Sequence, residues 1–120
     1  MEIKTHLIDD TKIAEVISDS IVIKTTGDGI ELMGNLYYQD FDRIIIHEKN
    51  ITVNFFDLKN GIAGEILQKF STYHVRLAIV GDFKHYTAKS LKDFIHESNK
   101  TGHINFVGST ADAIKALSKH

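Results

Sequence analysis

Two short, continuous apolar runs on either side of an amphipathic segment constrain this chain more than any other feature of its sequence. Residues 43–47 (RIIIH) and 74–80 (HVRLAIV) are rich in β-branched residues and do not alternate with polar ones, which is typical of strands buried on both faces. Between them, apolar residues recur at intervals of three and four from Leu58 to Tyr73, the spacing of a helix with one buried face. Because strand-helix-strand units cross over right-handed, this pattern predicts two central parallel strands covered by a helix.

The remaining segments extend this unit at both ends. Asp9-Asp10 supplies a turn between two alternating runs, Ser90 precedes a third helical pattern that ends near Gly102, and Ser109 or Thr110 precedes a fourth. The expected further elements are strands over residues 2–8, 12–17 and 104–107, and helices over residues 30–37, 90–102 and 110–117. The sequence therefore predicts a single α/β domain over residues 1–120, with a mixed sheet and the element order ββαβαβαβα.

Composition excludes several classes of protein. A formal net charge of -2, without a basic block, argues against a nucleic-acid partner. The chain has no cysteine, which excludes disulfides, thiolate metal sites and cysteine nucleophiles. No apolar run approaches the length of about 20 residues that spans a bilayer, and none follows Met1 as a signal segment. We expect a cytoplasmic protein with no membrane partner.

Polar side chains follow the two central strands, where the chain reaches the carboxyl edge of the predicted sheet. His47 and Glu48 come directly after the first strand, and Asp82 follows the second, with His85 in the same loop. Ligands of open α/β folds bind at this edge. The loop before the central helix meets the same edge. The candidate binding residues are therefore His47, Glu48, Asp57, Lys59, Asn60, Gly61, Asp82 and His85.

The start of the central helix carries small residues where bulky ones are usual. Gly61, Ala63 and Gly64 leave room for the sheet, a ligand or a partner to approach closely, and packing against the sheet is the commoner use. Asp57 lies where its carboxylate can accept hydrogen bonds from free N–H groups of the first turn. Capping alone would account for Asp57, so its part in binding is a hypothesis.

No recognised catalytic or cofactor motif is present. The segment TTGDGIELMG at residues 25–34 enters a helix through glycines, but it lacks the GxGxxG and Walker patterns, and we interpret it as capping and turn formation. No serine lies in a GxSxG elbow, which disfavours a simple hydrolase. Without an HxH or HExxH pair, we expect no metal and no cofactor. The dispersed histidines are His6, His47, His74, His85, His96, His103 and His120.

The chain resembles a small bacterial family that is classed only as a domain of unknown function. The resemblance covers nearly the whole length and rests on the segments NLYYQDFDRIIIHE, FFDLKNGIAGEILQKFSTY, LAIVGDF and SLKDFIHESNK. That family implies no activity.

More distantly, the element order and the Asp57 before a glycine-rich helix start resemble STAS domains, the modules of anti-sigma-factor antagonists and sulphate transporters. This resemblance implies a mixed sheet and a binding or regulatory role. In such antagonists a serine or threonine shortly after the Asp is phosphorylated by a partner kinase and controls docking. Here Leu58, Lys59, Asn60 and Gly61 follow Asp57, and none carries a hydroxyl. The phosphorylation switch therefore does not carry over, whereas a docking surface at this helix start can.

Two classes of function stay open at this point. The first is a non-enzymatic regulatory module that docks a protein partner, or a small ligand, at the carboxyl edge. The second is a small enzyme that uses Asp57, Asp82, His85 and Tyr86 for acid-base chemistry on a compact metabolite. A pocket of several hundred cubic ångströms with convergent polar groups favours the enzyme, and a flat surface favours the docking module. A homodimer built through the aromatic residues near Tyr38 and Phe56 is a further arrangement.

Overall fold

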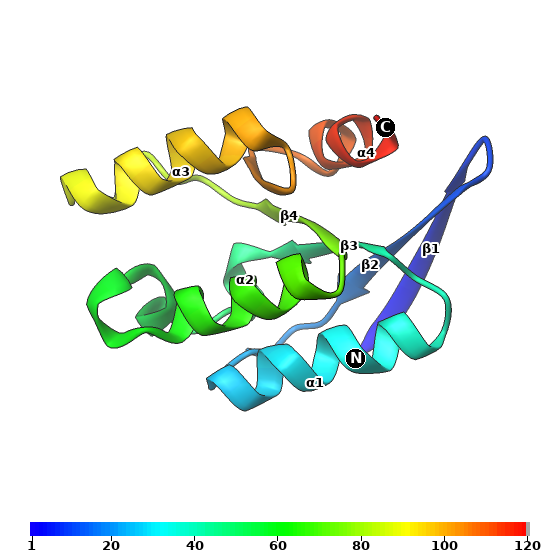
Figure 1. Ribbon diagram of the computed structural model, residues 1–120, viewed down its shortest axis with the longest axis horizontal. Coiled ribbons are helices and arrows are strands. Elements are labelled where there is room, and N and C mark those ends of the chain that lie inside the picture. The colour runs from blue at the N-terminus through cyan, green and yellow to red at the C-terminus, as the bar shows by residue number, and fades with distance from the viewer. Residues whose placement is uncertain (120) are drawn as a thin grey trace.

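The chain forms one five-stranded sheet with helices on both of its faces (Figure 1). The computed structural model describes residues 1–119, so His120 lies outside the described part. The strands are β1 (Glu2–Ile8), β2 (Thr11–Ile17), β3 (Arg43–His47), β4 (Arg76–Val80) and β5 (Ile104–Val107). The helices are α1 (Thr26–Tyr38), α2 (Ile62–Thr72), α3 (Lys89–Thr101) and α4 (Thr110–Ser118), with 3₁₀ turns at Glu48–Asn50, Val53–Phe56 and Leu58–Asn60. The predicted α/β class and the order ββαβαβαβα are confirmed.

The strands lie side by side in the order of the sequence, from β1 at one edge to β5 at the other. β1 and β2 form an antiparallel hairpin, and β2, β3, β4 and β5 run parallel to one another. Ile45 of β3 lies opposite Ala78 of β4, and both side chains are fully buried. The two continuous apolar runs therefore form the central parallel strands, as predicted.

Two hydrophobic cores lie on opposite faces of the sheet. The larger core contains Ile44 and Ile46 of β3 and receives side chains from α1, α2 and α3. The smaller core contains Ile45 and receives its helical side chains from α4. Successive residues of a strand point to opposite faces, so one apolar run serves both cores. The hairpin keeps exposed apolar residues on the α4 face, at Ile8 and Ile17.

The starts of α1 and α4 follow local side-chain chemistry. Thr25 Oγ1 accepts a hydrogen bond from the Asp28 N–H at 3.1 Å, and the Asp28 carboxylate accepts one from the Thr25 N–H at 3.2 Å, which makes a capping box. Ser109 Oγ accepts from the Asp112 N–H at 3.1 Å. The interpretation of residues 25–34 as a cap and turn is confirmed, and of the two predicted caps of α4, Ser109 and Thr110, the structure has Ser109.

The predicted N-cap of α3, Ser90, is wrong by two residues. α3 begins at Lys89, and the residue before it, Ala88, has no side chain that can accept a hydrogen bond from the first turn. Ser90 lies inside the helix. Asp93, which the sequence places three residues after a Ser90 cap, instead pairs with Lys89, with its Oδ2 2.8 Å from the Lys89 Nζ.

The predicted start of α2 is also wrong. α2 begins at Ile62, because Gly61 adopts a left-handed conformation with φ of 81° and separates α2 from the 3₁₀ turn Leu58–Asn60. Asp57 caps that 3₁₀ turn and not the α-helix, since its Oδ1 accepts from the Lys59 N–H at 3.4 Å. The first apolar residue of the pattern, Leu58, therefore lies in a 3₁₀ turn, and the later ones lie in α2.

Close packing of α1 on α2 depends on Gly29. A Cβ added to Gly29 would lie 2.6 Å from the Ile66 Cδ1, so a larger residue fits only if the Ile66 side chain or α2 shifts. A Cβ on Gly64 would meet no atom within 4 Å. Among residues 1–119, no element packs closely on Gly64, and the close approach of one helix to another occurs at Gly29 instead.

Candidate functional site

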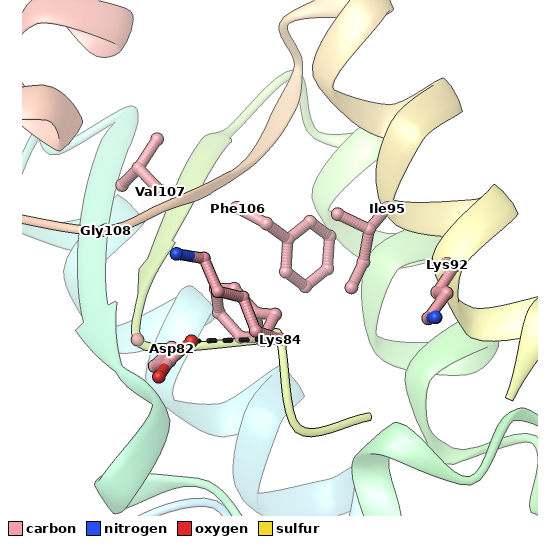
Figure 2. A pocket seen from close by; sticks show the side chains of 9 residues that line it. Asp82, Lys84, Lys92, Ile95, Phe106, Val107 and Gly108 are labelled. Atoms are coloured by element: carbon pink, nitrogen blue, oxygen red, sulfur yellow. Dashed lines mark hydrogen bonds between the residues drawn. The ribbon is translucent and has the colours of Figure 1, made fainter. Parts of the chain in front are cut away.

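A cavity opens at the carboxyl ends of β4 and β5, between these strands and α3 (Figure 2). Its volume is about 680 Å³, and it is lined by residues 81–84, by two residues of α3 and by residues 106–108. Phe106 and Ile95 supply apolar surface, and Lys84 and Lys92 lie on opposite sides of them. The cavity occupies the position where open α/β folds bind ligands, and its volume falls within the range of about 300–1,000 Å³ common for such sites.

Three charged side chains line this cavity, those of Asp82, Lys84 and Lys92, and all three are exposed. Asp82 Oδ1 accepts a hydrogen bond from the Lys84 backbone N–H at 3.1 Å, drawn as a dashed line in Figure 2, so this carboxylate helps to hold the loop. Among the ion pairs within residues 1–119, none includes Lys84 or Lys92. The cavity therefore presents two free ammonium groups beside an apolar surface.

Stacked aromatic rings support the loop that follows β4. Phe83 lies edge-on to Phe106, with ring centroids 5.3 Å apart, and Tyr86 stacks on Phe56 at 4.9 Å. Aromatic pairs of this kind contribute about 0.5–1.5 kcal/mol beyond the area they bury. Phe56 is buried, whereas Tyr38, the other aromatic residue considered for a dimer contact, is 92% exposed. Phe56 thus ties the turn before α2 to the loop after β4.

Glu48 and His85, both predicted site residues, come together with Tyr86. The Tyr86 hydroxyl donates to Glu48 Oε2 at 2.7 Å, and His85 Nε2 lies 3.6 Å from the same oxygen. A Cβ on Gly81 would lie 2.5 Å from Glu48 Oε1, so this glycine makes room for the carboxylate. Burial, together with the hydrogen bond to Glu48 and its negative charge, raises the pKa of Tyr86. A second cavity, of about 280 Å³, lies beside this cluster.

The turn before α2 holds four predicted site residues, Asp57, Lys59, Asn60 and Gly61. The Asn60 side-chain amide donates to the Asn54 carbonyl at 2.7 Å, and its Oδ1 accepts from the Ile62 N–H at 3.0 Å. None of the four lines the cavity of about 680 Å³, and among the predicted site residues Asp82 does. This turn therefore lies beside the cavity's loop, joined to it through the aromatic stack, and not inside the cavity.

His47 belongs to a different cluster, on the α4 face of the sheet. The two carboxylate oxygens of Glu15 lie 2.8 Å from His6 Nε2 and 2.7 Å from His47 Nε2, and each accepts a hydrogen bond from an imidazole. Glu15 is only 5% exposed. Burial raises the pKa of Glu15, but the hydrogen bonds and positive charge of His47 and His6 outweigh burial, so the pKa lies below its ordinary value of 4.5.

Sequence reasoning missed Glu15 and His6, although one signal was present. Glu15 interrupts the apolar strand Thr11–Ile17, and a buried carboxylate needs hydrogen-bond partners. The predicted turn at Asp9-Asp10 places β1 beside β2, but the sequence does not show that β3 lies on the other side of β2, so it could not bring His47 to Glu15. Sequence reasoning also missed Lys92 and Phe106, which reach the cavity from α3 and β5.

Two further features bear on what the chain can bind. Within the described residues, no group of three or more histidines and carboxylates is arranged to hold a metal ion. Among the helices of residues 1–119, none is long and apolar enough to cross a membrane. His120, one of the seven histidines, lies outside the described residues.

The chain is similar to known proteins at two levels. The family model described as Domain of unknown function (DUF4180) matches residues 8–117. No curated protein matches the chain. Among solved structures, the chain is similar to a Thermotoga maritima protein provisionally described as an anti-sigma factor antagonist, with 10% sequence identity, a TM-score of 0.47, and coverage of 98% of this chain and 95% of that chain. A likeness this weak does not transfer a function.

Proposed function

The chain belongs to the family described as Domain of unknown function (DUF4180), and we propose that it is a non-enzymatic regulatory or binding module that docks a protein partner at the carboxyl edge of its sheet. The observation that carries this proposal is the cavity of about 680 Å³, with apolar surface between two exposed lysines. An apolar side chain flanked by acidic residues complements both features. The cytoplasm, expected from the sequence, is the compartment in which we propose that it works.

The surface beside the cavity favours a protein partner over a compact metabolite. Exposed charges of both signs occur in the loop after β4, at Asp82 and Lys84, and in the turn before α2, at Asp57 and Lys59. The stack of Phe56 on Tyr86 joins these two segments. Mixed charge spread over two segments suits the polar rim of a protein interface, around an apolar centre. In this proposal the predicted site residues Asp57, Lys59 and Asp82 form part of the polar rim around the cavity.

The groups that the cavity offers for acid-base or covalent chemistry are the side chains of Asp82, Lys84 and Lys92. Among the described residues that line it, none carries a hydroxyl, thiol or imidazole group. A nucleophile needs an adjacent base within hydrogen-bond reach, and Asp82 already accepts a hydrogen bond from its own loop. The cavity therefore suits binding better than chemistry.

Selection of displayed peptides on the immobilised chain tests this function. We expect enrichment of peptides with an apolar residue flanked by Asp or Glu, and their affinity should fall at least about tenfold, or about 1.4 kcal/mol, in the double variant Lys84→Glu, Lys92→Glu. The double variant Lys24→Glu, Lys115→Glu has the same change in net charge at exposed sites outside the cavity and should bind normally. Peptides without acidic residues, or equal binding by both variants, would contradict the proposal.

A second candidate function is a small enzyme centred on Glu48, Tyr86 and His85. The hydrogen bond from Tyr86 to Glu48, beside a cavity of about 280 Å³, is the observation that favours it. The raised pKa of Tyr86 opposes it, because a general acid works best with a pKa near the working pH. A metabolite that stabilises the wild type in a thermal-shift screen and is turned over, with turnover lost in Glu48→Gln, would establish the enzyme over the docking module.

A further inference from the structure

The two edge strands of the sheet, β5 and β1, differ in whether their outward-facing N–H and C=O groups have hydrogen-bond partners. At the β5 edge, the Asn99 side chain of α3 accepts from the Phe106 N–H at 2.7 Å and donates to the Phe106 carbonyl at 3.2 Å. This side chain takes the place of a neighbouring strand. Natural proteins cover or interrupt edge strands in such ways because open edges pair with other chains.

The β1 edge has no such cover within residues 1–119. Ile8 and Thr11 face each other as the last pair of the hairpin, across a two-residue loop. A loop of this length closes on a hydrogen-bonded pair, and bonded pairs alternate with non-bonded ones along an antiparallel ladder. The N–H and C=O groups of Ile3, Thr5 and Leu7 therefore point away from β2, and none has a partner among the described residues.

The edge also carries an apolar side chain that the fold leaves uncovered. Leu7 is 69% exposed, although it alternates with Ile3 and Thr5 on the same face as the larger core. The hairpin extends beyond the helices in Figure 1. The segment after α1 reaches the β2 side of its tip, where Lys12 Nζ donates to the Gln39 carbonyl at 2.8 Å, but Leu7 stays exposed. β1 thus combines free backbone groups with an exposed apolar residue in one seven-residue strand.

We propose that β1 pairs with β1 of a second copy, antiparallel, about a twofold axis through Thr5, so that the two sheets become continuous. This register places Ile3 opposite the partner's Leu7 and Lys4 opposite the partner's His6. It pairs all seven residues of β1 and brings neither two lysines nor two carboxylates directly opposite each other. Two basic side chains meet where Lys4 faces the partner's His6, and each His6 is paired with Glu15 of its own chain. The contact is self-complementary, as a twofold dimer requires, and strand addition at an open edge supplies its hydrogen bonds.

The mass of the chain in solution, measured by light scattering after size exclusion, tests the dimer. We expect twice the chain mass of 13.5 kDa for the wild type. Thr5→Pro removes an outward-facing N–H but no bond to β2, so it should give the monomer mass with an unchanged circular dichroism spectrum. Leu7→Lys, which puts a charge on the exposed edge, should do the same. Tyr38→Lys alters another exposed apolar residue and should stay dimeric.

The register is tested by cysteine substitution, since the chain has no cysteine of its own. Thr5→Cys should form a covalent dimer under mild oxidation, because bonded residues across such a ladder have Cα atoms about 5.5 Å apart, within the range for disulfides. Thr101→Cys, exposed on α3, should not.

A monomeric wild type at the highest soluble concentration overturns the proposal. A dimer that survives Leu7→Lys and does not cross-link through Thr5→Cys also overturns it, because the interface then lies elsewhere. If Thr5→Pro fails to fold, Leu7→Lys and Thr5→Cys still decide the question, since both substitutions lie at exposed positions.

Discussion

The carboxylates of Glu15 and Glu48 both lie near the end of β3, but they have different surroundings. Glu15 is bonded between strands of the sheet, and Glu48 is bonded to a loop at the surface. Glu15 lies on β2 between His6 of β1 and His47 of β3, with both oxygens engaged and 5% of the residue exposed. Glu48 lies just beyond β3, and its Oε2 accepts the hydroxyl of Tyr86 in the loop after β4. The first cluster is held by three paired strands, and the second is held by loops.

The difference follows from how much freedom the partners have. A carboxylate without water is tolerated only when its hydrogen-bond partners cannot move away, and neighbouring strands provide such partners. Loop residues at a cavity keep contact with solvent and can exchange one partner for another. We therefore assign the Glu15 cluster to the stability of the sheet and the Glu48 cluster to the carboxyl edge where binding is proposed.

The largest expected loss of stability comes from placing a carboxylate without histidine partners on the α4 face of the sheet. Ile45 pairs with Glu15 in the register of β2 and β3 and is fully buried. Ile45→Asp should abolish folding, because an uncompensated buried charge costs several kcal/mol of a stability of about 5–15 kcal/mol. Urea denaturation should then show no cooperative transition. Ile45→Val should lose only about 0.5–1.5 kcal/mol, and a cooperative melt of Ile45→Asp would break the comparison.

Removing the charge of Glu15 comes next in size. Glu15→Gln keeps the shape but weakens two charge-assisted hydrogen bonds, so the free energy of unfolding should fall by about 1–3 kcal/mol. Glu2→Gln, an exposed change on β1, should stay within about 0.5 kcal/mol of wild type in the same urea titration. Equal unfolding free energies for the two variants would show that the Glu15 cluster does not stabilise the sheet.

The loss of unfolding free energy in Glu15→Gln should also depend on pH. The folded-state pKa of Glu15 lies below 4.5, so the unfolded chain binds the proton more readily. The stability that Glu15 contributes is therefore fully present above a pH of about 4.5 and is lost as the pH falls through the lowered folded-state pKa. The difference in unfolding free energy between wild type and Glu15→Gln should shrink on acidification. A difference that stays constant would mean that the carboxylate charge does not stabilise the fold.

The smallest expected effect belongs to the loop cluster. Tyr86→Phe removes one hydrogen bond to the partly exposed Glu48 and should lower the free energy of unfolding by about 1 kcal/mol. Tyr38→Phe, at a residue that is 92% exposed, serves as the control and should not change it. If Tyr86→Phe lowered the free energy of unfolding as much as Glu15→Gln, both clusters would stabilise the fold to the same extent, and the comparison would fail.

Much of the fold could be predicted because it depends on consecutive residues. The apolar runs identified β3 and β4, and the Ser109 cap of α4 needed only the residues that follow it. The start of α2 could not be predicted in this way. Apolar spacing continues smoothly from Leu58, and it does not reveal that Gly61 turns left-handed and breaks the helix there.

The candidate site was predictable in part for the same reason. Glu48 and Asp82 follow neighbouring parallel strands, so their place at one edge of the sheet follows from strand order. The apolar surface of the cavity did not follow, because Phe106 and Ile95 come from later elements whose facing sides depend on how α3 packs on β5. Local patterns contain no information about that packing.

The sequence by itself determined which segments are strands and helices and, through their order, where the polar loops gather. Those properties arise from the periodicity of apolar residues and from short-range hydrogen bonds, which need only neighbours in the chain. The tertiary structure alone decided that Glu15 is buried between two histidines, that Gly29 and not Gly64 admits a neighbouring helix, and that two lysines flank an apolar cavity. Each of these depends on residues far apart in sequence, which meet only when strands and helices pack.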